Sequence, residues 1–282
     1  MLKWQNDVIT AMRHSGSILK SRFEERYLVP LGHRMKGFNV KSPHELVLEE
    51  DLMVEKILVE ELSGLFPDFG IYSEEMPDFY RFRDDPRAKF IIDPLDGTHN
   101  YYFGIPEWGI SVTHVSPECV PLSSFIYLPV LDFMVFCLGN GISTRMVSPV
   151  CTVDTSTSSR ITLGEALVAY DNQFYKFGPD AIERFERLTR KTFTTRITGS
   201  AAFDTVMVAL GNFDARIWNK VEPYDIAAAI PIIRGSGGVV SDFQGNDIQS
   251  LDGGQVVISC NHDISRELAD VLNHDSVFSE KN

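Results

Sequence analysis

Apolar residues recur at helical spacing in the first 65 positions of the chain. Trp4, Met12 and Leu19 share one face of a helix, because residues seven or eight positions apart lie on the same side. Glycines between positions 32 and 37 are predicted to end this helix. A second helix is predicted over 54–65, where apolar positions at the same spacing are separated by Glu and Lys. Each helix therefore has one face to bury.

Short apolar runs bounded by turn residues predict strands in the remainder of the chain. They cover 69–73, 90–92, 108–115, 123–137 as a hairpin bent near Pro129, 166–170, 213–218, 239–240 and 256–259. Helices are predicted at 180–190, 200–210, 222–234 and 263–272. Pro231 falls deep inside the third of these helices, where it removes a hydrogen bond and bends the axis. Because helices and strands do not alternate regularly, the order favours an α/β fold of the layered α+β kind over a doubly wound sheet.

The length of 282 residues suits one large domain or two fused halves. No repeat and no obvious linker interrupts the sequence, so we expect a single unit over 1–282. The weakest join lies at 147–160, which is rich in Ser, Thr and Pro. It would separate a metal-binding α+β half at 1–150 from a substrate-facing α/β half at 151–282.

The charge balance bears on which partners the chain binds. The formal net charge is -13 and the isoelectric point is about 5.0. Nucleic acids are polyanions that attract basic surfaces, so this composition argues against nucleic-acid binding. A small anionic substrate is repelled in the same way unless a local cation reverses the sign, which makes a bound metal worth seeking.

The four cysteines form no C-x-x-C pair and lack a neighbouring His cluster, which indicates free thiols in a reducing compartment. No signal peptide is visible at the N-terminus. The longest apolar stretch, 125–138, is shorter than the roughly 20 residues of a membrane span and contains Asp132. We therefore expect a cytoplasmic protein that binds no membrane.

Two aspartates follow the apolar strand predicted at 90–92. Asp93 stands at the strand's end, and Asp96 lies three residues further on in a turn. Their carboxylates can face one point, with the Leu95 carbonyl between them. Hard oxygen ligands of this kind suit Mg²⁺, which binds few protein carboxylates and takes its other ligands from water and substrate phosphate. The alternative is an Asp-Pro turn followed by an Asp-Gly turn without a metal.

The same turn offers backbone donors for an anion. Gly97 and Thr98 leave their N–H groups exposed if the chain turns after Asp96. Such groups bind phosphate oxygens well. The segment thus combines candidate metal ligands with a candidate phosphate site.

Two more acids lie at ends of predicted elements. Glu74 follows the short strand at 69–73, where an exposed Glu pair on a loop is the alternative. Asp225 lies in the first turn of the helix at 222–234, where a helix cap is the alternative. Four acids brought together repel one another unless cations are present. A two-metal cluster, with ions about 3.5–4 Å apart, resolves this repulsion.

These segments, in this order, resemble the inositol monophosphatase superfamily. Residues 41–51 resemble its early segment, Glu74-Glu75 its acidic pair, and 93–100 its signature loop. Residues 224–227 and 237–242 resemble its C-terminal signature. The resemblance covers nearly the whole chain and implies an α-β-α-β-α sandwich.

The resemblance also assigns roles to individual residues. The metal ligands it implies are Glu74, Asp93, the Leu95 carbonyl, Asp96 and Asp225, for two or three Mg²⁺ ions. The catalytic residues it implies are Asp51, Thr98 and Glu74, and Asp51 and Thr98 look like the pair that orients the attacking water. Gly97 and Thr98 would hold the phosphate.

The substrate-facing residues match the family's pattern only in part. Gly199, Ser200 and Ala201 resemble the segment that contacts the non-phosphate part of the substrate, and an ordinary helix cap is the alternative. Trp218 stands where the inositol-specific branch usually carries an acid. An indole accepts no hydrogen bond from a sugar hydroxyl, although it can stack on a ring. The identity of the substrate is therefore the open question.

The sequence predicts a Mg²⁺-dependent phosphomonoester hydrolase acting on a small polyol or sugar phosphate. Alternative substrates are a 3′-phosphoadenosine nucleotide, fructose 1,6-bisphosphate or histidinol phosphate. A non-catalytic relative that binds anionic ligands is the alternative of another class. The expected partner is a small phosphorylated metabolite, and the resemblance also allows a homodimer, which no sequence feature requires.

Overall fold

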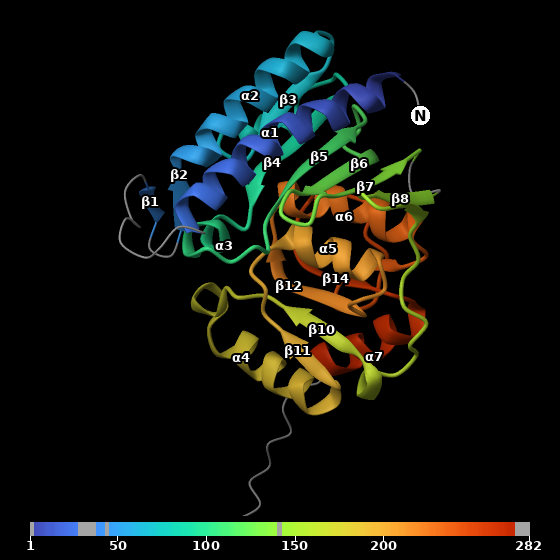
Figure 1. The fold of residues 1–282 in the computed structure, drawn as a ribbon. Coiled ribbons are helices and arrows are strands. Elements are labelled where there is room, and N and C mark those ends of the chain that lie inside the picture. The colour runs from blue at the N-terminus through green and yellow to red at the C-terminus, as the bar shows by residue number, and fades with distance from the viewer. Residues whose placement is uncertain (1–2, 28–37, 43–44, 140–142, 274–282) are drawn as a thin grey trace, which may run out of the picture.

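Two large β-sheets and three layers of helices make up most of the described part of the chain. The structure is a computed structural model that describes residues 3–27, 38–42, 45–139 and 143–273. Figure 1 shows α1 and α2 on the outer face of one sheet, α5 and α6 between the two sheets, and α4 and α7 on the far face of the other. This arrangement confirms the predicted layered α-β-α-β-α sandwich.

The first sheet has seven strands in the order β3-β4-β5-β6-β7-β8-β9. They are β3 (Gly70–Ser73), β4 (Lys89–Asp96), β5 (Gly109–Val115), β6 (Pro121–Leu128), β7 (Phe133–Leu138), β8 (Ser143–Val147) and β9 (Thr152–Asp154). All neighbours pair antiparallel except β3 and β4, which run parallel. The two outer helices, α1 (Lys3–Tyr27) and α2 (Glu49–Leu65), bury their apolar faces against this sheet.

The second sheet has five strands in the order β11-β10-β12-β14-β13. They are β10 (Leu167–Tyr170), β11 (Thr194–Arg196), β12 (Ala215–Val221), β13 (Val239–Ser241) and β14 (Gly254–Ser259). Its outer face carries α4 (Phe174–Lys191) and α7 (His262–Asn273), which bury one side each. A small hairpin of β1 (Phe38–Ser42) and β2 (Glu45–Leu48) stands apart from both sheets.

The middle layer consists of α5 (Ala201–Ala209) and α6 (Pro223–Gly235). Both helices are buried almost throughout, because each has a sheet on either side. A helix apolar all round fits such a position, and the alanines at 227–229 let α6 approach the sheet closely. The starts of these two helices supply part of the site described below.

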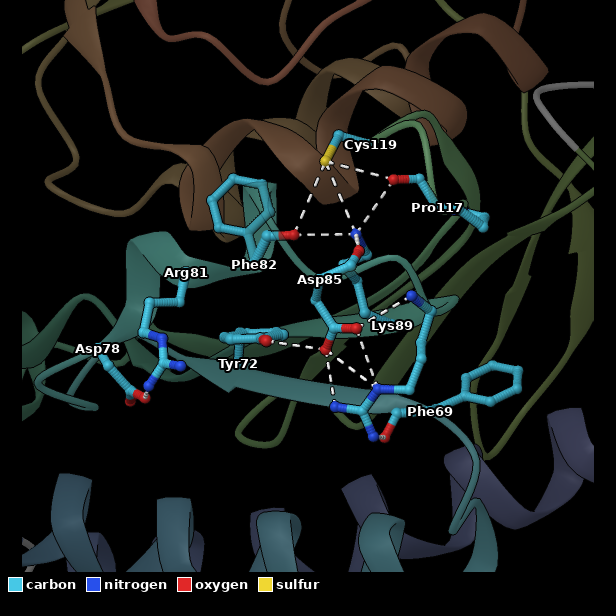
Figure 2. A network of polar contacts seen from close by, with 10 residues as sticks. Phe69, Tyr72, Asp78, Arg81, Phe82, Asp85, Lys89, Pro117 and Cys119 are labelled. Atoms are coloured by element: carbon cyan, nitrogen blue, oxygen red, sulfur yellow. Dashed lines mark hydrogen bonds and ion pairs between the residues drawn. The ribbon is translucent and has the colours of Figure 1, made fainter.

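The start of β4 is anchored by a fully buried lysine. Lys89 Nζ donates to the carbonyl oxygens of Phe82 at 2.9 Å, Asp85 at 2.7 Å and Pro117 at 3.2 Å, as Figure 2 shows. Three carbonyl acceptors satisfy the three donors of the side chain, which makes its burial tolerable. The lysine therefore ties the connection between β3 and β4 to the loop after β5.

Most predicted elements are present, with differences in extent. The first helix continues to Tyr27, and the predicted break at 32–37 lies outside the described residues. The helix predicted at 180–190 is preceded by a turn from Phe174 that is interrupted at Gly178. Pro231 is accommodated inside a continuous α6.

Several short elements had no clear sequence signal. They are β1, β2, β8, β9, β11, the helix α3 (Thr98–Phe103) and the 3₁₀ turns η1 (Phe79–Arg83) and η2 (Leu163–Glu165). Strands of three to five partly exposed residues bury too little to show a pattern. Within the described ranges, no helix is long and apolar enough to cross a membrane. The single-unit hypothesis and its division near residue 150 stay predictions.

Candidate active site

Asp93 and Asp96 lie at the end of β4, as the sequence predicted. Asp93 pairs with Ser111 of β5 and Asp96 with Gly109, so three steps along β4 span two steps along β5. The extra residue makes a bulge, which re-aims side chains locally. The Leu95 N–H donates to Asp93 Oδ1 at 3.1 Å and fixes that carboxylate inside the bulge. Both aspartates are buried.

The helix α6 brings Asp225 to the same place. Pro223 occupies the first helical position, and Asp225 follows in the first turn. Carboxylate oxygens of Asp93, Asp96 and Asp225 all lie within 4.8 Å of one another. We call these three residues the carboxylate cluster.

The charges of this cluster oppose one another. Burial raises the pKa of Asp93 well above its usual range, and the charges of Glu74, Asp96 and Asp225 raise it further. Burial, followed by the charge of Asp96, raises the pKa of Asp225 to about 8. Ionised carboxylates at such a distance are stable only with a cation among them. The donor set is all oxygen, so the residues present fit Mg²⁺.

Glu74 lies beside the carboxylate cluster. It follows β3 directly, and its N–H donates to the Ile92 carbonyl at 3.1 Å. Because β3 and β4 are parallel, their carboxyl ends meet at one edge of the sheet. After burial, the charge of Glu74 is the largest influence on the pKa of Asp93. The structure thus brings together all four predicted acids, and their role as ligands stays a prediction.

Asp51 and Thr98 are in contact, as predicted for the water-orienting pair. Thr98 Oγ1 lies 3.0 Å from Asp51 Oδ1 and 3.1 Å from the Leu95 carbonyl oxygen. Asp51 lies in the first turn of α2 and accepts from the Leu48 N–H at 2.8 Å. Burial raises the pKa of Asp51 to about 7. A carboxyl group with such a pKa exchanges a proton near neutrality.

Gly97 begins the short helix α3 in a left-handed conformation, with φ of 85°. A side chain there is strained, and its Cβ would meet the Glu107 carbonyl oxygen at 3.0 Å. The glycine therefore lets the chain turn sharply after Asp96 and start α3 at Thr98. Phosphate binding by the N–H groups of Gly97 and Thr98 stays a prediction.

The start of α5 binds Asp96. Ser200 caps the helix, accepting from the Phe203 N–H at 3.1 Å, and its hydroxyl donates to Asp96 Oδ2. The N–H groups of Ala201 and Ala202 donate to the same carboxylate at 3.0 and 2.9 Å. Burial raises the pKa of Asp96, and these three hydrogen bonds oppose the rise. The cap interpretation is confirmed, and substrate contact by Gly199, Ser200 and Ala201 stays a prediction.

Trp218 belongs to the core between the sheets and is 4% exposed. The Arg216 guanidinium carbon lies 5.0 Å from the centre of its ring. Substrate stacking on Trp218 stays a prediction that this burial does not favour.

Three polar residues near the site carried no recognised signal in the sequence. Asn100 Nδ2 on α3 donates to the carbonyls of Glu107 at 2.7 Å and Thr198 at 2.8 Å. Asp204 on α5 and Arg216 on β12 form a buried ion pair at 3.1 Å. An arginine between Ala215 and Ile217 in a strand was the available signal for this pair, since buried cations require partners.

This layered fold, in which buried acids meet at strand ends and a helix start, is typical of phosphatases that use Mg²⁺. The chain belongs to the inositol monophosphatase family, whose model matches residues 3–280. Magnesium dependence is general in this family.

Individual relatives carry several names. A fructose-1,6-bisphosphatase/inositol-1-monophosphatase of Thermotoga maritima is 30% identical over 213 residues, which cover 73% of this chain and 75% of the relative. A histidinol-phosphatase of Chlorobaculum parvum is 26% identical over 225 residues, or 79% and 81% of the two chains. The solved structure of the extragenic suppressor protein suhB of Bartonella henselae superposes with a TM-score of 0.83 at 25% identity, covering 96% of this chain and 99% of that one.

Proposed function

We propose that the chain is a Mg²⁺-dependent phosphomonoesterase that releases phosphate from a small polyol or sugar phosphate. The observation that carries this proposal is the carboxylate cluster, whose oxygens lie within 4.8 Å of one another. The net charge of -13 on this chain repels an anionic substrate, so a cation is needed where the phosphate would bind. The cluster offers a place for that cation.

Glu74, Asp93, the Leu95 carbonyl, Asp96 and Asp225 would hold two or three Mg²⁺ ions. When bound, Mg²⁺ supplies Lewis-acid activation of water and neutralises charge on the phosphate. The burial of Asp93 and Asp96 limits competition from bulk water for these oxygens. The hydrogen bonds from the start of α5 restrict the Asp96 carboxylate to one orientation.

Thr98 and Asp51 would orient the attacking water. A threonine hydroxyl has one proton to donate and two lone pairs to accept with. The acceptors for this proton are Asp51 Oδ1 and the Leu95 carbonyl oxygen, so the lone pairs of Oγ1 are left to accept from a water. A water that donates to Oγ1 directs its own lone pairs away from Thr98, and Asp51 fixes the orientation of the hydroxyl.

The relatives include a fructose-1,6-bisphosphatase/inositol-1-monophosphatase and a histidinol-phosphatase, so the substrate has to be determined by experiment. A 3′-phosphoadenosine nucleotide and fructose 1,6-bisphosphate stay alternatives. A binding-only relative is disfavoured because a degraded site would have lost an acid, whereas Glu74, Asp93, Asp96 and Asp225 are all present. The homodimer and the cytoplasmic location remain predictions of the sequence.

The test is phosphate release from a panel of phosphomonoesters with Mg²⁺. The panel contains inositol phosphates, sugar phosphates, histidinol phosphate and 3′-phosphoadenosine nucleotides. Asp96→Asn should lower kcat by at least about 100-fold, because the amide no longer supplies a second anionic oxygen to a cation. Asp252→Asn, a change at an exposed acid, is the control and should retain activity.

Turnover that EDTA abolishes and Asp96→Asn removes supports the proposal and names the substrate class. A folded wild-type protein that binds Mg²⁺ yet hydrolyses no member of the panel would contradict it. Full activity of Asp96→Asn would show that the cluster is not the site.

A further inference from the structure

The side chain of Arg216 enters the layer between the two sheets. Along β12, Ala215 and Ile217 pack toward the outer helices, whereas Trp218 packs toward α5 and α6. Alternation along a strand places Arg216 on the same face as Trp218. Arg216 is 4% exposed, so its charge is removed from solvent.

Three elements meet at this guanidinium. Arg216 Nη1 lies 3.1 Å from Asp204 Oδ2 on α5 and also donates to the Tyr170 carbonyl at the end of β10. Its guanidinium carbon lies over the ring of Trp218, 5.0 Å from the ring centre. Because Asp204 is fully buried, the two charges depend on each other for compensation. The ion pair thus fixes α5 against two neighbouring strands.

Asp204 also connects the ion pair to the signature loop at 93–100. Its Oδ1 accepts from Thr198 Oγ1 at 2.6 Å. The Thr198 carbonyl in turn accepts from Asn100 Nδ2, and Asn100 is the last residue of the signature loop at 93–100 and lies in α3. The segment leading into α5 is therefore held at both of its ends.

One helical turn separates Asp204 from the donors that bind Asp96. The Asp204 N–H bonds to the Ser200 carbonyl at 3.2 Å, so the two residues move with the same turn of α5. Ser200, Ala201 and Ala202 contact both oxygens of Asp96. A rotation or shift of α5 therefore re-aims the Asp96 carboxylate.

We propose that the Asp204–Arg216 ion pair is a positioning pair for the metal site, which orients Asp96 by fixing the start of α5. The inference rests on the proposed function, because it assumes that Asp96 is a metal ligand. Neither residue needs to touch the substrate or a metal for this role.

The test compares variants of the ion pair by their affinity for Mg²⁺, measured by titration calorimetry without substrate. Arg216→Met alone leaves a buried, uncompensated Asp204 and is expected to fold poorly. The double variant Asp204→Leu with Arg216→Met replaces both charges by apolar groups, which buried ion pairs often tolerate. We expect it to fold and to bind Mg²⁺ about 10- to 100-fold more weakly, the range typical of residues that orient metal ligands.

Two further variants separate positioning from general packing. Arg160→Met with Asp214→Asn removes another buried aspartate's ion pair, which lies directly before the start of β12, and should leave Mg²⁺ affinity unchanged. Arg216→Lys keeps a cation but not the planar fork, so its affinity should lie between those of the wild type and the double variant.

A folded double variant with wild-type Mg²⁺ affinity would overturn the inference, and so would equal weakening by the control pair at Asp214. Because calorimetry needs no turnover, this result is independent of the substrate panel. Weakened Mg²⁺ binding supports the positioning pair even if no substrate is hydrolysed. Unchanged Mg²⁺ affinity of the double variant, in a protein that hydrolyses a substrate, would refute the positioning role of the ion pair without contradicting the phosphatase proposal.

Discussion

Single side chains close to β4 show how buried charge is tolerated in this protein. Asp85 lies beside the Lys89 anchor and accepts from Tyr72 at 2.8 Å and from Arg87 Nη2 at 2.7 Å, as Figure 2 shows for Tyr72. The hydrogen bonds from Arg87 hold the pKa of Asp85 well below its usual range, against the effect of burial. The ionised form of Asp85 is therefore the one that stabilises the fold.

Asp85→Asn should lower the free energy of unfolding by about 2 kcal/mol at neutral pH, the scale of a hydrogen bond to a charged group. A carboxyl group whose pKa is lowered in the folded state stabilises the protein when the pH is above its ordinary pKa. This stabilisation is lost as the pH falls through the lowered pKa of the folded state. The difference in Tm between wild type and variant should therefore shrink below about pH 4.

The control for this variant is Asp78→Asn, which removes an exposed ion pair with Arg81. Exposed pairs contribute little, so its Tm should stay close to that of the wild type. A Tm difference for Asp85→Asn that persists unchanged at acidic pH would contradict the assignment of charge.

The sequence predicts correctly that Asp93, Glu74 and Asp225 lie at a strand end or a helix start, where the backbone limits the direction of a side chain. Their role as metal ligands stays a prediction. The hydrogen bond between Ser200 and Asp96 joins residues 104 positions apart, and no local pattern encodes such a separation. Trp218 was assigned to the substrate by position in the family, whereas its burial follows from strand pairing that the sequence does not show.

At the scale of elements, α6 approaches the seven-stranded sheet more closely than a side chain allows. A Cβ added at Gly235 would collide with Thr144 Oγ1 and would lie 2.8 Å from Cys137 Sγ. Thr144 also donates to the Ile232 carbonyl at 2.9 Å, so it cannot move without losing that bond. The glycine near the end of α6 is required by packing.

Gly235→Ala should destabilise the protein by about 1–3 kcal/mol, the cost of inserting a methyl group into a packed core. Gly64→Ala is the matched control, because Gly64 lies in α2 with no atom within 4 Å of the added Cβ. That change should stabilise by about 0.5–1 kcal/mol, since alanine favours a helix over glycine. Chemical denaturation of both variants is the measurement, and equal effects of the same sign would refute the packing argument.

Element prediction worked best for long segments with one buried face. The helix α2 and the strands β4 to β7 carry their pattern over many residues. The strands β8, β9 and β11 lie at or next to an edge of their sheets and exist because neighbouring strands offer them hydrogen bonds, which is a property of the assembled sheet. Their residues are partly polar and bury little side-chain surface, so their sequences carry no strand pattern and predict loops.

For the whole molecule, the carboxylate cluster links stability to metal and pH. The pKa of Asp225 is raised to about 8 and that of Asp93 well above its usual range. Between the ordinary pKa of 3.8 and the raised pKa of about 8, the metal-free folded protein holds a proton on Asp225 that the unfolded chain has released. The stability of the metal-free protein is therefore greatest at the acidic end of this pH range and falls as the pH rises through about 8.

Mg²⁺ should raise the Tm and remove most of this pH dependence, because it binds the ionised cluster of the folded state only. The gain is about 2.7 kcal/mol when Mg²⁺ is at 100 times its dissociation constant. Thermal unfolding in EDTA and in excess Mg²⁺, between about pH 6 and pH 9, measures both effects. Identical curves under the two conditions would show that the cluster binds no cation.

The topology also sets the order in which the site is assembled during synthesis. The strands from β4 to β9 each pair with the next along the chain, so their ladder needs no residue beyond Asp154. Strand pairing alone therefore allows Asp93 and Asp96 to take their places before the second half has been synthesised. Asp225 and the start of α5 arrive later, and α6 reaches the first sheet only after the chain has passed residue 235. A nascent chain shorter than this carries Glu74, Asp93 and Asp96 without Asp225, so its acidic site is incomplete.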